Sequence, residues 1–400
     1  MKVLVVVEGI CLPGVSMTGI GTIYEIQKCL ARKGVEVHIL TSICQWSKIP
    51  EDRQKEWFDS QEKRHFIKFH YVHSSYKNIW INHLEIKSAF LRRIYQLDKT
   101  YKYDIVNEYS SSPLLLIETN LIKKLTHACA IHTWCTYLSG ILGSAKTSRI
   151  CYKRYVDKII CLTKHMFDEM IEAGWPEAKL THIPIGIESA HFSGPSHGPS
   201  LRDQLNIPQD RSVVLFLGPL EERKGAFVLA QACVPVLASY PDVMFVFATF
   251  GSGGIDEGHE INKEKLYRLT TGSENSILVL EGHQNVHDLF KMADIFVLPQ
   301  TSGHGTIANP VTLLEAMASG AACIASDIIG VNEVIDDGQN GLLFQNRNSL
   351  NLADRIVELL QSEDLRLSLG RRAREKIAAE YDIDKVVNRI LKIYQSIYRC

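Results

Sequence analysis

The 400-residue sequence lacks any uninterrupted apolar run that approaches eighteen residues, although 46% of its residues are hydrophobic. A helix needs about that length to cross a bilayer, so the sequence indicates a globular protein without a spanning helix. Met1 and Lys2 lead directly into a short apolar run that is followed by Glu8. This start is unlike a secretory signal peptide, and we therefore expect a cytoplasmic protein.

Close cysteine pairs are also absent. The ten cysteines are scattered from Cys11 to Cys400 with no spacing typical of a zinc or redox motif, which favours reduced thiols. An Asp-x-Asp motif, Asp382-Ile383-Asp384, precedes a helical pattern instead of following a strand, so we interpret it as a helix start and not as a cation site. We expect no metal ion and no other cofactor.

Net charge is almost absent, at −1, which argues against general binding of nucleic acid. The charges are nonetheless unevenly divided. Residues 1–200 contain 25 Lys and Arg against 19 Asp and Glu, and residues 201–400 contain 19 against 26. A basic first half favours an anionic ligand or peripheral association with a membrane surface, and ordinary solvated side chains explain it almost as well.

The length exceeds what one hydrophobic core usually supports. A segment rich in Gly, Pro and Ser, residues 194–200, separates two patterned halves. In both halves short apolar runs alternate with glycine-containing turns and helical patterns, which is typical of doubly wound α/β sheets. We predict an N-terminal domain over residues 1–195, a C-terminal domain over residues 201–382 and an amphipathic final helix within residues 383–400.

Individual elements follow from the period of the apolar residues. Strands are predicted over residues 3–7, 35–40, 104–107, 128–131, 213–217, 244–249, 277–280 and 295–298. Helices are predicted over residues 22–32, 227–238, 310–319 and 385–398. Residues 46–103 are rich in aromatic, His and Lys side chains but show no regular period, and no element is assigned there.

The stretch from Asp294 to Phe344 is the most informative. A short apolar run is followed by a polar, glycine-rich loop and then by a helix, for which Asn309 is the predicted N-cap and Pro310 the first helical residue. Gly320 stands where a helix-ending glycine belongs. The helix start is therefore predicted to face the loop that follows a strand.

Three residues of this helix have the properties of a nucleotide site. The backbone amides of Val311 and Thr312 carry partial positive charge and would stabilise a phosphate without any basic side chain. Glu315, on the second turn, offers a bidentate acceptor for the paired hydroxyls of a ribose. Composition alone supports an ordinary surface glutamate equally well.

A second strand-turn-helix unit precedes this one. The apolar run that ends at Gly218 is followed by the charged turn PLEERKGAF. Lys224 beside Gly225 is able to bring an ammonium to a phosphate, while the glycine allows close approach of the backbone. Taken without its flanking strand and glycines, this turn is better interpreted as a solvated cluster of charges.

Residues 313–344 closely resemble the donor-binding half of the retaining GT-B glycosyltransferases that use nucleotide sugars, the group 1 family related to bacterial mannosyltransferases, sucrose synthases and glycogen synthases. The resemblance runs nearly end to end. It implies an α/β GT-B fold, with two Rossmann-like domains facing across a cleft and the acceptor bound by the N-terminal one. It further implies transfer to a hydroxyl of a glycan, lipid-linked or small-molecule acceptor, with retention and without a metal ion.

The resemblance also implies roles for individual residues. His132 and Lys224 are the catalytic candidates, with His132 near the transferred sugar; without the resemblance, His132 is better interpreted as an ordinary histidine. The implied donor-binding residues are Gly19, Gly21, Arg223, Lys224, Gly251, Asn285, Ile307, Ala308, Asn309, Val311, Thr312 and Glu315. Among them, Glu315 is implied to bind the ribose and Lys224 the diphosphate.

Several positions depart from the family pattern, including Glu188 where an aspartate is common, and they make the chain a divergent member. Ile307 replaces a glutamate that usually contacts the donor sugar, and Pro219 replaces an arginine that usually contacts the diphosphate, for which Arg223 is a candidate substitute. Ile185 stands where asparagine is common. A Gly-Gly pair is altered to Gly19-Ile20-Gly21.

Three other functions are considered. An NAD-dependent dehydrogenase is disfavoured because Tyr24 occupies the third glycine position of the dinucleotide fingerprint. A nucleotide-sugar epimerase of the same fold would need carboxylates around the sugar, and Ile307 counts against it. A family member that binds a nucleotide sugar without catalysis and supports a partner subunit remains open, because Pro219, Ile307 and Ile185 all lie at positions that are usually functional.

Overall fold

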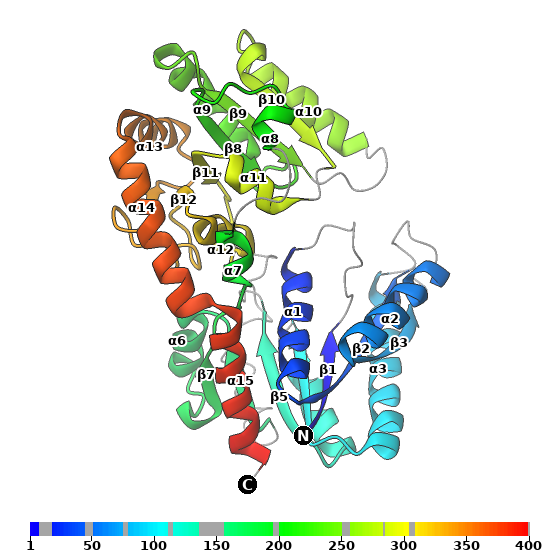
Figure 1. Ribbon diagram of the computed structural model, residues 1–400. Coiled ribbons are helices and arrows are strands. Elements are labelled where there is room, and N and C mark those ends of the chain that lie inside the picture. Colours follow the sequence, from blue (N-terminus) through cyan, green and yellow to red (C-terminus); the bar gives the residue numbers. More distant parts are fainter. Residues whose placement is uncertain are drawn as a thin grey trace. The chain divides into compact units, whose positions relative to one another are not determined.

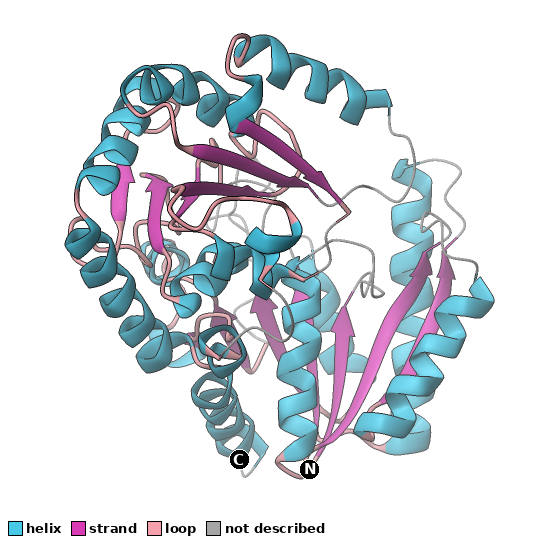
Figure 2. Cartoon of the chain, turned by 45° about the horizontal axis from the view of Figure 1, so that its top comes forward, coloured by secondary structure: helices cyan, strands magenta, loops and turns pink. Residues whose placement is uncertain are grey.

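The computed structural model describes residues 1–7, 18–44, 51–74, 79–110, 115–135, 156–194, 200–249, 257–282, 285–303 and 309–398. The chain divides into two compact units. Unit 1 consists of residues 1–186, 304–309 and 383–400, and unit 2 of residues 187–303 and 310–382. Each unit contains a parallel sheet with helices on both of its faces (Figures 1 and 2).

Unit 1 contains a seven-stranded sheet in the order β3-β2-β1-β4-β5-β6-β7. Its strands are β1 (Lys2–Val7), β2 (Glu36–Cys44), β3 (Lys68–Ser74), β4 (Ile105–Ser110), β5 (Cys129–Trp134), β6 (Lys158–Cys161) and β7 (Leu180–His182). Its helices are α1 (Thr18–Arg32), α2 (Glu51–His65), α3 (Ile79–Tyr101), α4 (Leu115–Leu125), α6 (Lys164–Glu172), the 3₁₀ turn η1 (Glu177–Lys179) and α15 (Ile383–Tyr398).

Helix α15, at the end of the chain, belongs to unit 1 and lies beside α1 (Figure 1). Two contacts hold it there. The Asn107 side-chain amide donates to the Tyr394 hydroxyl at 2.8 Å, with both residues fully buried. Gly186 packs so closely against the helix that a Cβ atom on it would lie 2.9 Å from the Cβ of Val386. The last helix is therefore part of the packing of unit 1.

Unit 2 contains a six-stranded parallel sheet in the order β10-β9-β8-β11-β12-β13. Its strands are β8 (Val213–Leu217), β9 (Met244–Thr249), β10 (Ile277–Glu281), β11 (Ile295–Leu298), β12 (Ala322–Ser326) and β13 (Leu342–Phe344). Its helices are α7 (Ser189–Ser193), α8 (Leu201–Gln204), α9 (Ala226–Ser239), α10 (Glu257–Leu269), α11 (Val286–Met292), α12 (Val311–Ser319), α13 (Ser349–Gln361) and α14 (Glu363–Lys376), with a 3₁₀ turn η2 (Glu274–Ser276) and a π-helical turn η3 (Ile377–Tyr381).

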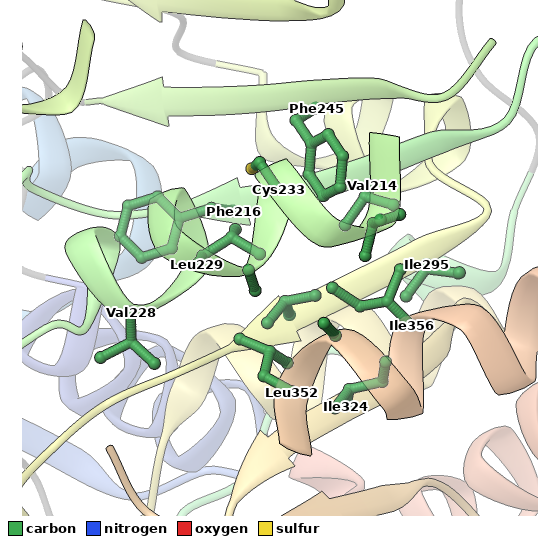
Figure 3. Packing of buried hydrophobic residues seen from close by; sticks show 14 of the residues in the cluster. Val214, Phe216, Val228, Leu229, Cys233, Phe245, Ile295, Ile324, Leu352 and Ile356 are labelled. Atoms are coloured by element: carbon green, nitrogen blue, oxygen red, sulfur yellow. The ribbon is translucent and has the colours of Figure 1, made fainter. Parts of the chain in front are cut away.

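The core of unit 2 forms where α9 and α13 cover one face of this sheet (Figure 3). Leu229 and Cys233 of α9 and Ile356 of α13 are fully buried there, together with Val214 and Phe245 of the sheet. Complete burial of an aliphatic side chain contributes about 1.5–3 kcal/mol. This packing fixes the positions of the strand ends and of the loops that follow them.

The sequence predictions for the strands of unit 2 are confirmed in their bounds for β8, β9 and β11, and within one residue for β10. In unit 1 the helix predicted to start at residue 22 begins four residues earlier, at Thr18, and includes Gly19 and Gly21 in its first turn. The stretch 46–103, to which no element was assigned, contains two helices and a strand, α2, α3 and β3. Residues 195–199 of the predicted linker lie outside the described residues.

Candidate functional site

The order in which strands are added to the sheet of unit 2 reverses between β8 and β11. These two strands are neighbours, although β9 and β10 come between them in the chain and lie on the other side of β8. In open α/β sheets, ligands bind outside the carboxyl ends of the strands at such a crossover. The loops that start at Gly218 and Pro299, together with helix α12, lie at this edge.

The two loops are joined directly. Gly225 adopts φ +76° at the start of α9, and a Cβ atom on it would lie only 1.7 Å from the carbonyl oxygen of Pro299. The backbone carbonyl of Arg223 accepts a hydrogen bond of 3.0 Å from the amide of Thr301. The glycine is therefore required for the approach of two backbones, as well as for its conformation.

This loop presents two cationic side chains. Lys224 is partly buried, and among the described residues no carboxylate pairs with its ammonium group. Burial, reinforced by the charge of Arg223, lowers the pKa of Lys224. Arg223 has one guanidinium nitrogen 3.5 Å from Glu221, while its Nη1 atom is buried with no hydrogen-bond partner in the described part of the chain. An anionic ligand would satisfy both groups.

Helix α12 begins one residue later than predicted. It starts at Val311, with Pro310 at the N-cap position and no side chain capping it. Asn309 is not the N-cap, because its Oδ1 atom accepts the Ile185 amide at 3.1 Å, within unit 1. The amides of Val311 and Thr312 still lie in the first turn, where a helix supplies no acceptor.

The end of α12 agrees with the sequence prediction. Gly320 ends the helix at φ +84°, the left-handed conformation of a helix-ending glycine. The Gly320 amide donates to the carbonyls of Ala316 and Met317.

Glu315 lies on α12 with its Oε2 atom buried and without a hydrogen-bond partner among the described residues. Burial raises the pKa of its carboxyl group to about 8. A buried polar atom without a partner destabilises a fold by about 1–3 kcal/mol, so such groups point to a ligand that supplies the missing bonds. A pair of ligand hydroxyls has the required donors.

Other candidate residues are placed differently. Gly251, Ile307 and Ala308 lie outside the described residues. Gly19 and Gly21 belong to α1 in unit 1. The topology of unit 2 thus brings five of the predicted residues to one edge of its sheet, and these are Arg223, Lys224, Val311, Thr312 and Glu315.

Asn285 is the N-cap of α11. Its side chain accepts the amide of Asp288 at 3.4 Å. This contact gives the residue a structural task at the start of that helix.

His132 lies in unit 1, near the carboxyl end of β5, and is fully buried. Its Nδ1 atom lies 3.1 Å from the hydroxyl of Thr119 on α4 and 3.7 Å from the carboxylate of Glu108 on β4. The Thr119 hydroxyl donates to that same carboxylate. The Nε2 atom of His132 is buried with no partner among the described residues.

Sequence reasoning did not identify Glu108 or Thr119. Glu108 is opposite His132 in the register of β4 and β5, but the two residues are 24 positions apart in the sequence and share no local motif. The alternation of side chains within each strand was the available signal.

A further group missed from the sequence consists of His259 and Glu260 on α10 and Glu281 at the end of β10. Their ligand atoms lie within 4.8 Å of one another. Lys263 already pairs with Glu281, so we interpret this group as a cluster of surface charges.

The Asp-x-Asp motif begins α15, as predicted. Asp382 precedes the helix and accepts a hydrogen bond of 2.6 Å from the Ser189 hydroxyl, and Asp384 pairs with Lys33 at 3.0 Å. Six cysteines in the described part of the chain are free thiols, and they are Cys29, Cys129, Cys135, Cys161, Cys233 and Cys323. Within the described ranges, no helix combines the length and the apolar character needed to cross a membrane.

Comparison with known proteins covers most of the chain. Residues 199–376 match the family model "Glycosyl transferases group 1", and residues 21–191 match "Glycosyltransferase Family 4". Spore coat protein SA of Bacillus subtilis is 26% identical over 226 residues, which cover 55% of this chain and 59% of that protein. The UDP-Gal:alpha-D-GlcNAc-diphosphoundecaprenol alpha-1,3-galactosyltransferase of Escherichia coli is 24% identical over 75% of this chain and 77% of its own length.

The fold has solved counterparts. The crystal structure of a glycosyltransferase from Rickettsia africae matches with a TM-score of 0.78 and 20% identity, over 99% of this chain and 98% of that one. The predicted α/β architecture of two doubly wound parallel sheets, the GT-B fold, is thereby confirmed.

Proposed function

Because this chain belongs to the group 1 glycosyltransferases, we propose that it transfers a sugar from a nucleotide diphosphate sugar to an acceptor hydroxyl, with retention at the anomeric carbon. One observation carries this proposal. At the crossover of unit 2, the structure gathers a helix start, a lysine and a carboxyl oxygen, and among the described residues neither side-chain group has a partner. The three groups complement the phosphates and the ribose of a nucleotide.

Each group has its own task in this proposal. The amides of Val311 and Thr312 and the ammonium of Lys224 bind the diphosphate and stabilise the charge that develops on it as the sugar departs. Preorganised groups of this kind usually supply the largest catalytic contribution. Glu315 accepts hydrogen bonds from the two ribose hydroxyls. Arg223 replaces the cation that Pro219 removes from the family pattern.

The same groups support a reaction without a metal ion. Helix amides and a lysine neutralise the departing diphosphate, which is the task that a divalent ion performs in other enzymes. Transfer should therefore continue at an undiminished rate in EDTA. Strict dependence on added Mn²⁺ or Mg²⁺ would contradict this part of the proposal.

The galactosyltransferase of Escherichia coli guides the choice of substrates. Its name gives a UDP sugar as the donor and a sugar linked to diphosphoundecaprenol as the acceptor. We propose a UDP sugar as the first donor to test and a lipid-linked acceptor beside free glycans and small molecules. A lipid-linked acceptor fits a cytoplasmic protein that associates peripherally with a membrane, to which the basic balance of residues 1–200 is suited.

A second candidate function is binding of a nucleotide sugar without catalysis. Pro219 and Ile307 favour it, since the family pattern has a cation and a carboxylate at these positions. Binding and turnover must therefore be measured separately.

Calorimetric titration with UDP, GDP and TDP and with their sugars tests binding. Replacing Lys224 by Met should weaken the binding of a nucleoside diphosphate by about 10- to 100-fold, the equivalent of a charge-assisted hydrogen bond of about 1.5–3 kcal/mol. The binding of the nucleoside alone should not change. Lys291→Met is the matched control, because Lys291 is an exposed lysine of unit 2 on α11. Equal effects of the two variants would contradict the assignment of Lys224.

The task of Glu315 is tested with the 2′-deoxy nucleotide. The wild type should bind it more weakly than the ribonucleotide, and Glu315→Gln should bind both with similar affinity. The two proteins and the two nucleotides form a double-mutant cycle, which isolates the contact between the carboxylate and the hydroxyl. Transfer and slow donor hydrolysis are then followed with labelled sugars, and NMR of the product gives its anomeric configuration. Binding without any turnover would favour the second candidate, and no binding of any nucleotide would overturn both.

A further inference from the structure

Unit 1 contains a chain of three buried polar side chains whose members come from different elements. Glu108 of β4 and His132 of β5 are neighbours across the sheet, and Thr119 of α4 bridges them. The exposed fraction is 2% for Glu108 and zero for Thr119 and His132. Burial of three polar groups is unfavourable unless they bond to one another, so their arrangement is specific.

The direction of these hydrogen bonds determines the tautomer of His132. A threonine hydroxyl has one hydrogen, and Thr119 donates it to the carboxylate of Glu108. Toward His132, at 3.1 Å, the same oxygen is then able only to accept. The Nδ1 atom must therefore carry the proton, and in a neutral imidazole the Nε2 atom is left as an acceptor. The carboxylate 3.7 Å from Nδ1 favours the same tautomer.

The acceptor created in this way is unused. The Nε2 atom of His132 is buried and has no hydrogen-bond partner among the described residues. Trp134, two residues further along β5 and on the same side of the strand, packs edge-on against the imidazole with ring centroids 5.7 Å apart. Its indole Nε1 atom, which is only a donor, is also buried and without a partner. A hydroxyl group is able to donate to the first and accept from the second.

We propose that Glu108 and Thr119 are positioning residues that hold His132 in the Nδ1–H tautomer, so that its Nε2 atom accepts a hydrogen bond from a hydroxyl of the bound sugar. This inference rests on the proposed function for its ligand. The hydrogen-bond chain that sets the tautomer belongs to unit 1 alone. Neither Glu108 nor Thr119 has to touch the ligand.

The opposite face of the same two strands provides a comparison. There Asn107 and Thr133 bond to each other at 2.8 Å, and Asn107 bonds to Tyr394. That series of hydrogen bonds ends in a hydroxyl group that already serves as an acceptor. The series through Glu108 and Thr119 ends in a nitrogen that has no partner within the described ranges. The series through Glu108, Thr119 and His132 therefore leaves an acceptor atom for a ligand, whereas the series through Asn107 does not.

NMR of the full-length protein with ¹⁵N-labelled histidine tests the tautomer without any substrate. The signals of His132 are identified by their loss in His132→Gln. We expect a protonated Nδ1 and an unprotonated Nε2 in the wild type. A protonated Nε2, whether in the other tautomer or in an imidazolium, would overturn the proposal.

Isosteric variants test the cause. Thr119→Val removes the hydroxyl and should mix the two tautomers, whereas Thr119→Ser keeps the hydroxyl and should give the wild-type spectrum. Glu108→Gln tests the carboxylate without a large change of volume and should also mix the tautomers. Thermal unfolding of each variant checks that it is folded. A spectrum unchanged in both Thr119→Val and Glu108→Gln would assign these residues to packing alone.

Kinetics then connect the tautomer to the ligand. For any donor and acceptor that the wild type uses, Thr119→Val should lower kcat/KM by about tenfold, as the loss of one well-placed hydrogen bond predicts, and Thr119→Ser should restore it. The affinity for UDP without a sugar should stay unchanged, and an equal loss for UDP would contradict the role at the sugar. Absence of all turnover would overturn the proposed function, while the NMR result would still decide the positioning role.

Discussion

The two units have the same type of sheet but treat their polar groups in opposite ways. In unit 2 the crossover leaves the ammonium of Lys224 and the Oε2 atom of Glu315 without partners among the described residues. In unit 1 most buried polar side chains of β4 and β5 bond to one another, whereas the Nε2 atom of His132 and the Nε1 atom of Trp134 have no partner among the described residues.

This difference distinguishes two ways of preparing a protein for a ligand. Unpaired groups, as in unit 2, give up stability in the absence of the ligand and gain their bonds when it arrives. A closed network, as in unit 1, supports the fold and fixes the orientation of one remaining atom. Variants that remove groups of each kind should therefore have opposite effects on stability.

The largest effect is expected at Gly225, which permits the close approach of the two loops at the crossover of unit 2. Gly225→Ala would place its Cβ atom 1.7 Å from the Pro299 carbonyl oxygen, and we expect a loss of more than about 4 kcal/mol in the free energy of unfolding. Gly272→Ala is the control, because Gly272 has a similar φ of +83° with no atom within 4 Å of the added Cβ. That variant should lose only about 1–2 kcal/mol.

Urea unfolding followed by circular dichroism measures both changes. Similar losses for the two glycine variants would mean that backbone conformation alone accounts for Gly225. In that case the close approach of the two loops would not be important for the unit.

The next effect concerns Glu315, whose buried Oε2 atom has no partner in the described part of the chain. Burial raises its pKa to about 8, whereas an ordinary glutamate titrates near 4.5. The folded state therefore holds a proton that the unfolded state releases, and the contribution of the group is present below pH 4.5 and is lost as the pH rises through 8. Because one pKa unit corresponds to about 1.4 kcal/mol, Glu315→Gln should be more stable than the wild type by up to about 5 kcal/mol at pH 9 and similar to it at pH 4.5.

Thermal unfolding across this pH range measures the difference between the two proteins. The same variant should lose affinity for ribonucleotides, as argued above. A variant that is both less stable at pH 9 and impaired in binding would indicate that Glu315 supports the fold, and the contrast between the units would fail.

The opposite sign is expected in unit 1. Tyr394→Phe removes the acceptor for the buried amide of Asn107, and a buried donor left unpaired should lower the stability by about 1–3 kcal/mol. Tyr398→Phe is the control on the same helix, because Tyr398 is 54% exposed. Denaturant midpoints that fall equally in both variants would remove Tyr394 as the anchor of α15.

The same contrast explains how much could be predicted from the sequence. The signals in unit 2 are local: a glycine, a lysine and a helix start follow their strands directly, so β8, β11 and the residues at their ends were found. The one-residue error at α12 arose because the Asn309 side chain bonds to Ile185, a contact between distant segments.

In unit 1 the informative contacts are not local. Thr119 and Glu108 reach His132 only through the register of β4 and β5 and the packing of α4. The helices α2 and α3 were missed because their apolar positions are mixed with many charged and aromatic residues. Polar side chains that form hydrogen bonds between distant segments leave little periodic pattern in the sequence.

The smallest effect concerns two histidines on β2 and β3, at one edge of the sheet of unit 1. His38 of β2 is fully buried, and its Nδ1 atom lies 2.6 Å from the hydroxyl of Tyr103 and 3.2 Å from Nε2 of His70 on β3. Burial lowers the pKa of both histidines to about 4. Glu36 opposes the shift of His38, and the positive charge of Lys68 adds to both shifts.

These folded-state pKa values lie below the unfolded value of 6.5. Between about pH 4 and pH 6.5 the unfolded state therefore binds more protons than the folded state. The contribution of the neutral pair is therefore complete above pH 6.5 and decreases as the pH falls toward 4. His70→Gln should flatten this decrease by up to about 1.4 kcal/mol per pH unit, the value for one proton. His165→Gln, at a partly exposed histidine of α6, should leave the slope unchanged. If unit 1 depends on this neutral pair of histidines, acid should weaken it, while Glu315 makes unit 2 sensitive to base.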